Sequence, residues 1–160
     1  MDNLKNLLAD SELLLNAVGE GVYGFDLEGK AVFINPAAER MTGWQAGELL
    51  GEKIHQYHHH SHADGSPYPA HECNIYATMQ DGQERSISHE VFWRKDGSSF
   101  PVEYTSTPVY KNGEIVGAVA IFRDVTKQQE SDRALREALA QVQALSEQLQ
   151  AENTYLQSEI

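Results

Sequence analysis

The stretch that decides the fold is residues 90–126, EVFWRKDGSSFPVEYTSTPVYKNGEIVGAVAIFRDVT. It contains three strand-like segments, at 90–94, 100–105 and 115–122. The first two alternate polar and apolar residues, as half-buried strands do, whereas the third is apolar on both parities, which predicts a central strand. The turns Asp96-Gly97 and Asn112-Gly113 accept positive φ and therefore favour antiparallel hairpins.

Two more strands are predicted nearer the N-terminus. Strand-like runs at 22–25 and 31–34 flank Glu28-Gly29, which suits a hairpin turn. Asn35 and Pro36 then supply an N-cap and a first helical residue. The sequence therefore predicts five strands and a helix that follows the second of them.

The middle of the chain predicts short helices around a loop. Residues 55–69 are polar, rich in histidine and broken by glycine and proline, which predicts a loop. Residues 71–80 regain helical character, and leucines within residues 4–18 predict an N-terminal helix. Two strands, several short helices and three further strands predict an α+β fold with the helices gathered on one face of the sheet.

Composition limits the class of protein. The 160 residues fit one domain with an extension, and no run is long and apolar enough to cross a bilayer. A signal-peptide pattern is missing at the start, which predicts a cytoplasmic location without membrane contact. The net charge of −12 argues against nucleic acid contacts by this segment, and the lone Cys73 excludes an intramolecular disulfide.

The order of these motifs resembles the PAS domain family. The residues that carry the resemblance are 21–26 with Gly29, 32–38, Gly43-Trp44 with Leu50-Gly51, 93–97 and 123–126. It implies a five-stranded antiparallel sheet that cups a pocket beneath the short helices, where a small molecule or cofactor binds. It also implies three parts: an N-terminal helical cap at 1–20, a PAS core at 21–126 and a signalling helix at 127–160.

The closing Asp124-Val125-Thr126 resembles the Asp-x-Thr exit motif of the family. The resemblance implies that Asp124 and Thr126 tie the last strand to the outgoing helix and transmit the signal. The local alternative is that Thr126 is an N-cap and Asp124 an ordinary residue at the end of a strand.

The C-terminal tail carries a heptad pattern. Its a and d positions include Leu135, Leu139, Val142, Leu149, Asn153 and Leu156. An apolar seam with asparagine at an a position favours a parallel two-stranded coiled coil, and so a homodimer. The alternative is an amphipathic helix that folds back on its own domain.

The last residues indicate a biological context. Residues 149–160 resemble the linker that precedes the ATPase module of sigma-54-dependent bacterial transcription activators. The resemblance implies that this chain is the sensory part of a larger regulator of transcription, whose output module lies outside the chain. A histidine kinase is the alternative output.

The histidine-rich segment offers metal-binding side chains. Nitrogen and sulfur donors of the type that zinc and other transition metals prefer come from His55, His58, His59, His60 and His62, with His71 and Cys73 nearby. Within this group, His58, His60 and His62 are the predicted ligand set. Their spacing matches no established zinc signature, so a solvated polar loop is the alternative.

No cofactor is assigned from sequence. The resemblance implies two cofactor options. Some PAS domains ligate haem iron through a histidine on the helix before the third strand, for which His71 is the nearest match, and flavin photoreceptors carry a reactive-cysteine motif of which only Cys73 is present. No catalytic motif is found in the sequence, so we expect a non-enzyme.

The predicted ligand pocket follows from strand parity. If Glu90 and Arg94 face water, the inward set comprises Val91, Trp93, Val102 and Tyr104, with Ile75 and Met79 on the opposite wall. The same residues would also make a filled core. Two functions follow: a ligand-responsive sensor that signals through a coiled coil, or a constitutive dimerisation and protein-interaction module without a ligand.

Overall fold

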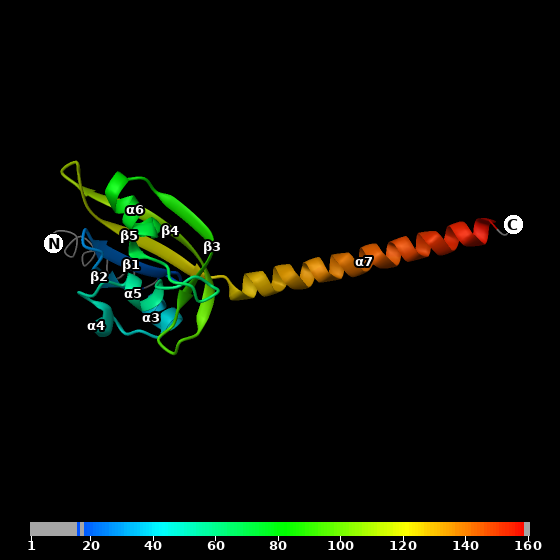
Figure 1. The fold of residues 1–160 in the computed structure, drawn as a ribbon, viewed down its shortest axis with the longest axis horizontal. Helices are drawn as coiled ribbons and strands as arrows, with labels where there is room; N and C mark the ends of the chain where they lie inside the picture. The colour runs from blue at the N-terminus through cyan, green and yellow to red at the C-terminus, as the bar shows by residue number, and fades with distance from the viewer. Residues whose placement is uncertain (1–15, 17, 159–160) are drawn as a thin grey trace. The chain divides into compact units, whose positions relative to one another are not determined.

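The computed structural model describes residues 16 and 18–158 (Figure 1). The predicted N-terminal helix lies almost entirely outside these residues. The chain divides into two units, Met1–Val125 and Thr126–Ile160. The first is an α+β unit, and the second is a helix.

A five-stranded antiparallel sheet forms the α+β unit. Its strands are β1 (Gly21–Asp26), β2 (Ala31–Ile34), β3 (Arg85–Trp93), β4 (Ser99–Lys111) and β5 (Glu114–Asp124), in the order β2-β1-β5-β4-β3. The central place of β5 was predicted from its apolar residues on both parities. The three hairpins lie at the predicted turns, and Asn112 and the turn glycines have positive φ.

Five short helical elements connect β2 to β3. They are α3 (Pro36–Thr42), α4 (Ala46–Leu49), α5 (His55–His58), the 3-10 turn η1 (Ala70–Glu72) and α6 (Asn74–Asp81). They lie over one face of the sheet, with α3 against β1 and α6 against β4 and β5 (Figure 1). The predicted cap of α3 is confirmed: the Asn35 side chain accepts a hydrogen bond from the Ala38 amide, and Pro36 follows.

The core fills the space between the sheet and these helices. Directly paired residues share a face of the sheet, so Phe92 with Phe100 and Tyr104 with Phe122 belong to the covered face. All four are buried, together with Tyr23 of β1 and with Leu49 and Ile54 from the helical segment.

The predicted parity of β3 is wrong. Glu90 pairs with Val102, so Glu90 shares the covered face with Phe92, while Val91 and Trp93 lie on the other face and are half-buried. The prediction rested on the assumption that a glutamate must face water. Here the glutamate is retained on the inner face by hydrogen bonds to Tyr104 and His59.

The predicted loop at 55–69 is also corrected in part. Its first residues form α5, and His58 and His59 are among the most buried residues of the described chain. A four-residue helix is too short to leave a clear periodic signal, and these histidines are held by tertiary contacts.

The second unit is the helix α7 (Thr126–Ser158), which has 33 residues and is separated in sequence from β5 by Val125 alone. It contains no buried residue in its described length. Among the described helices, none combines the length and apolar content that a membrane span requires.

Candidate functional site

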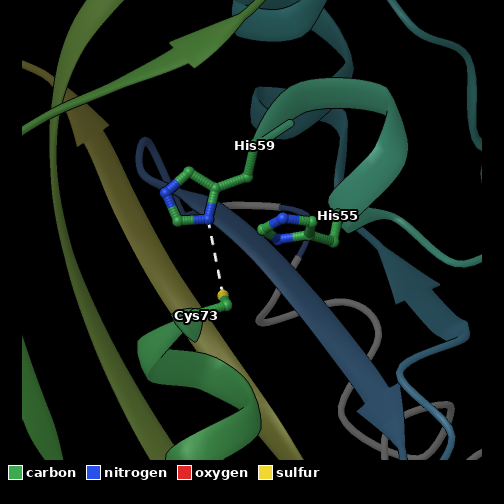
Figure 2. A group of neighbouring side chains, drawn as sticks. All are labelled: His55, His59 and Cys73. Atoms are coloured by element: carbon green, nitrogen blue, oxygen red, sulfur yellow. Dashed lines mark hydrogen bonds between the residues drawn. The ribbon is translucent and has the colours of Figure 1, made fainter. Parts of the chain in front are cut away.

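Three side chains from the helical segment meet beside the sheet. His55 opens α5, His59 follows the end of α5 one turn later, and Cys73 precedes the first residue of α6 (Figure 2). One ligand atom from each lies within 4.8 Å of those of the other two. We call these three residues the His/Cys cluster.

The cluster is buried and tightly spaced. His59 and Cys73 are each only 1% exposed, and His55 is half-buried. The Nδ1 atom of His59 lies 3.4 Å from the Sγ atom of Cys73, the contact drawn as a dashed line in Figure 2. A nitrogen and a sulfur donor are therefore in contact away from bulk water.

Glu90 fixes the orientation of His59. Its Oε2 atom lies 2.7 Å from His59 Nε2, and its side chain is 17% exposed. Tyr104 donates to Glu90 at 3.0 Å, with Tyr68 and Asn74 both at 3.3 Å. Because a carboxylate only accepts hydrogen bonds, Nε2 of His59 carries a proton and Nδ1 faces the cysteine.

A backbone carbonyl fixes the orientation of His55. Its Nε2 atom lies 2.7 Å from the carbonyl oxygen of Tyr68, which can only accept, so Nε2 is protonated. The Nδ1 atom of His55 is buried and has no hydrogen-bond partner in the described part of the chain. In the neutral ring, this atom keeps a free lone pair.

Electrostatics favour a charged pair in the cluster. Burial opposes ionisation of Cys73, but the imidazoles of His55 and His59 outweigh it and lower the pKa of the thiol to about 6. Burial likewise disfavours the charged form of His59, but Cys73 and Glu90 raise its pKa to about 9. The two shifts act in the same direction and favour a thiolate beside an imidazolium.

The ligand set predicted from sequence does not come together. His58 stacks on Tyr23 with ring centroids 4.9 Å apart, whereas His60 stacks on Trp93 and His62 on Tyr68. Burial holds the pKa of His58 well below its usual value, so His58 is a neutral core residue. The side chain of His71, the nearest candidate for a haem ligand, is 81% exposed.

Two of the true cluster members, His55 and His59, were visible in the sequence as histidines four residues apart. That spacing places side chains on one face only if the segment is helical, and it was read as a loop. For Cys73 the sequence leaves two interpretations open, a small buried apolar residue or a sulfur donor near the histidines. Cys73 is buried, but beside two imidazoles.

Four of the predicted pocket residues lie in the core. Ile75 and Met79 of α6 line a cavity of about 10 Å³ together with the His/Cys cluster, and Val102 and Tyr104 are buried in the adjoining core. This volume accommodates about one water molecule. Val91 and Trp93 lie outside it, on the other face of β3.

The predicted transmission residues lie where the sheet ends. Arg94, which follows β3, pairs with Asp124 at 3.3 Å, and the Val125 amide donates to the Pro101 carbonyl at 3.1 Å. Thr126 is the first residue of α7. The β3–β4 hairpin is thus linked to the last residues before α7 through Arg94, just after β3, and Pro101, near the start of β4.

The predicted seam residues all lie within α7. Leu135, Leu139, Val142, Leu149 and Leu156 are 58–63% exposed, and Asn153 is also exposed. The helix therefore carries an apolar stripe whose side chains are exposed to solvent.

Comparison with known proteins matches the PAS fold family to residues 9–125. Similar curated proteins include the "Probable diguanylate cyclase DgcE" of Escherichia coli (strain K12), which is 33% identical over 127 residues, 78% of this chain and 11% of that protein. The signal transduction histidine-protein kinase AtoS of the same organism is 25% identical over 86% of this chain and 22% of that protein. A blue-light photoreceptor of Listeria monocytogenes is 29% identical, with 82% of this chain covering 51% of that protein.

Solved structures give the same result. An RNA-binding light-oxygen-voltage receptor is 25% identical with a TM-score of 0.63, over 86% of this chain and 39% of that chain. The PAS domain of a Colwellia psychrerythraea protein has a TM-score of 0.60 at 22% identity, over 76% of this chain and 98% of that chain. Since the family match spans well over half of the sequence and the sheet has the predicted five strands, the chain belongs to the PAS fold family.

Proposed function

We propose that this chain is the sensory part of a larger cytoplasmic signalling protein, in which a PAS core receives a chemical signal and α7 passes it on as one strand of a parallel dimeric coiled coil. The observation that carries this proposal is the exposed stripe of a and d residues along α7. Only Val125 separates α7 in sequence from β5, the central strand of the sheet. A helix of 33 residues with such a stripe is stabilised by a partner helix of the same kind.

The proposed relay runs through the end of β5. Asp124 is paired with Arg94, and Val125 is hydrogen-bonded to Pro101. A shift of the β3–β4 hairpin would therefore displace the two residues that precede Thr126. A ligand shifts the equilibrium between two conformations of the core only by the difference between its binding free energies for those conformations. The proposed signal is a small molecule or an ion that enters the helix-covered side of the sheet.

The proposed output is control of transcription. Residues 149–160 resemble the linker that precedes the ATPase module of sigma-54-dependent activators, and this resemblance favours such a module. A histidine kinase is the second candidate output, because AtoS, a relative, is a histidine kinase. In either case the chemistry belongs to another domain, and this chain acts without catalysis or direct nucleic acid contact.

The dimer is tested by a matched pair of substitutions in α7. Leu156 occupies a d position and Tyr155 a c position, and both are about equally exposed at 59% and 63%. We expect Leu156→Ser to weaken dimerisation at least about tenfold, roughly 1.4 kcal/mol, and Tyr155→Ser to leave it unchanged. Sedimentation equilibrium of the full chain measures the dimer dissociation constant of each variant.

Equal effects of the two substitutions would contradict the heptad register. A monomeric wild-type chain at all accessible concentrations would contradict the coiled coil itself. Circular dichroism of both variants controls for loss of the fold.

A constitutive dimerisation module is the second candidate function. The small cavity favours it, because about 10 Å³ holds no organic molecule without movement of the core. A dimerisation constant and a core stability that respond to no metal ion or small molecule would support this candidate over the sensor.

A further inference from the structure

We propose that the His/Cys cluster binds one thiophilic transition-metal ion, of the zinc and copper class, through Nδ1 of His55, Nδ1 of His59 and Sγ of Cys73. All three residues are among the donors recognised in the sequence, but the set differs from the predicted ligands His58, His60 and His62 (Figure 2). Binding stands independently of the proposed function. Only the role of the ion as the sensed signal rests on it.

The spacing fits a metal centre. Zinc binds nitrogen at about 2.0–2.1 Å and sulfur at about 2.3 Å, so a tetrahedral centre places these two donors about 3.5 Å apart. The distance between His59 Nδ1 and Cys73 Sγ is 3.4 Å. The remaining distances within the cluster are at most 4.8 Å, which small rotations of the half-buried His55 can close.

The hydrogen bonds prepare both imidazoles for coordination. Each ring uses Nε2 for a buried acceptor, the Tyr68 carbonyl for His55 and the Glu90 carboxylate for His59. Each therefore turns Nδ1 toward the interior of the cluster. Carboxylates and carbonyls in this position are the usual partners of metal-binding histidines, because they fix the ring and raise its basicity.

The buried Nδ1 atom of His55 is the observation that most directly indicates a ligand. A buried polar atom without a hydrogen bond is unfavourable, and Nδ1 of His55 makes none among the described residues, although its ring lies close enough to Cys73 to lower the pKa of the thiol. A metal ion shared with His59 and Cys73 supplies the missing partner. The same ion replaces the proton that lies between His59 and Cys73 in the metal-free protein.

Donor chemistry sets the class of ion. One thiolate and two imidazoles suit zinc and copper, whereas magnesium and calcium prefer oxygen. Glu90, the nearest carboxylate, is occupied by His59 Nε2, Tyr104 and Tyr68. Three protein ligands leave a fourth position open, and the cavity that adjoins the cluster has room for about one water molecule there.

The test uses the full chain, stripped with a chelator and titrated with Co²⁺, Zn²⁺, Cu⁺ and Mg²⁺. We expect Co²⁺ to give a thiolate charge-transfer band with the intense visible absorption of tetrahedral cobalt. Zn²⁺ should displace Co²⁺, Cu⁺ should bind in competition with a chelating dye, and Mg²⁺ should do neither. A cobalt spectrum without the charge-transfer band would overturn the assignment of Cys73.

Variants assign the ligands. We expect Cys73→Ser to lose the charge-transfer band, and both Cys73→Ser and His59→Ala to lose at least tenfold in affinity. The matched controls His60→Ala and His62→Ala should keep both the band and the affinity. Glu90→Gln is a positioning variant that should bind the same number of ions with about 10–100-fold lower affinity. Urea unfolding of each apoprotein identifies variants that fail to fold, and His55→Gln provides a further ligand variant.

Two results would overturn the site. One is metal binding that survives both Cys73→Ser and His59→Ala in folded protein, and the other is loss of binding in His60→Ala and His62→Ala. A wild-type dimer that takes up none of the thiophilic ions would reject the metal site and leave the coiled coil standing. A wild-type monomer that binds metal would support the metal site and reject the coiled coil.

Discussion

Glu90 is the residue on which most of the site depends. It lies on the covered face of β3, opposite Val102, and its oxygens are shared by His59, Tyr104 and Tyr68. Burial opposes its ionisation, but His59 holds the pKa of Glu90 below its usual value. A charged carboxylate inside the helix-covered side of the sheet is costly unless it has such partners, which points to a role beyond packing.

The ionisation of Cys73 gives a prediction at this scale. In metal-free protein, thiolate absorbance at 240 nm should rise as the pH increases through about 6, because a lowered pKa keeps the thiolate above that pH. His59→Ala removes one of the two stabilising imidazoles while burial and His55 remain, so its midpoint should move to higher pH. His60→Ala is the control and should not move it. An unshifted midpoint in His59→Ala would contradict the pairing.

The residue scale is also where the sequence was least informative. Glu90 and His59 are 31 positions apart, and nothing local tells that a glutamate in an alternating strand has a buried partner. The parity of Val91 and Trp93 was therefore assigned to the wrong face. By contrast, Val102 and Tyr104 lie on a strand with no inward charge, and their burial follows from alternation alone.

At the scale of elements, the turns and strands were predictable because their signals are local. The Asp-Gly and Asn-Gly turns, the Asn35 cap and the doubly apolar β5 each act over a few residues. The helix α5 was not predictable in this way. It has four residues, and it is positioned by contacts of its histidines with β1, β3 and α6 rather than by its own periodicity.

The β1–β2 turn gives a prediction for an element. Gly29 has φ +80, and a Cβ at this position would collide with the Tyr76 ring, whereas Gly97 has φ +86 and open space around it. Both alanine variants strain the backbone by about 1–2 kcal/mol. We expect Gly29→Ala to lower the free energy of unfolding by a further 1 kcal/mol or so, since Tyr76 must move. Urea unfolding measures both, and equal losses would contradict the close approach of Tyr76.

At the scale of the whole molecule, the two units divide the task. The PAS core offers a buried cluster of titratable side chains, and α7 offers a long apolar stripe. The sequence predicted the stripe, because heptads are periodic over many turns. The members of the cluster are recognisable in the sequence as metal donors, but which of them meet could not be predicted, because that depends on how the ends of two short helices pack together.

Asn153 provides a prediction for the dimer. Asparagine at an a position lowers the stability of a coiled coil but specifies two parallel strands. Asn153→Leu should raise the melting temperature of the dimer and relax the choice of oligomer. Light scattering and circular dichroism check both, and an unchanged melting temperature with a strict dimer would contradict the register.

Native mass spectrometry of the full chain, after loading with Zn²⁺ and removal of excess ion, tests the metal site and the dimer together. We expect a dimer that carries one zinc ion per chain, and a Cys73→Ser dimer that carries none. A zinc-loaded Cys73→Ser dimer or a zinc-free wild-type dimer would contradict the His/Cys site. A monomer, with or without zinc, would contradict the coiled coil through which the sensor is proposed to signal.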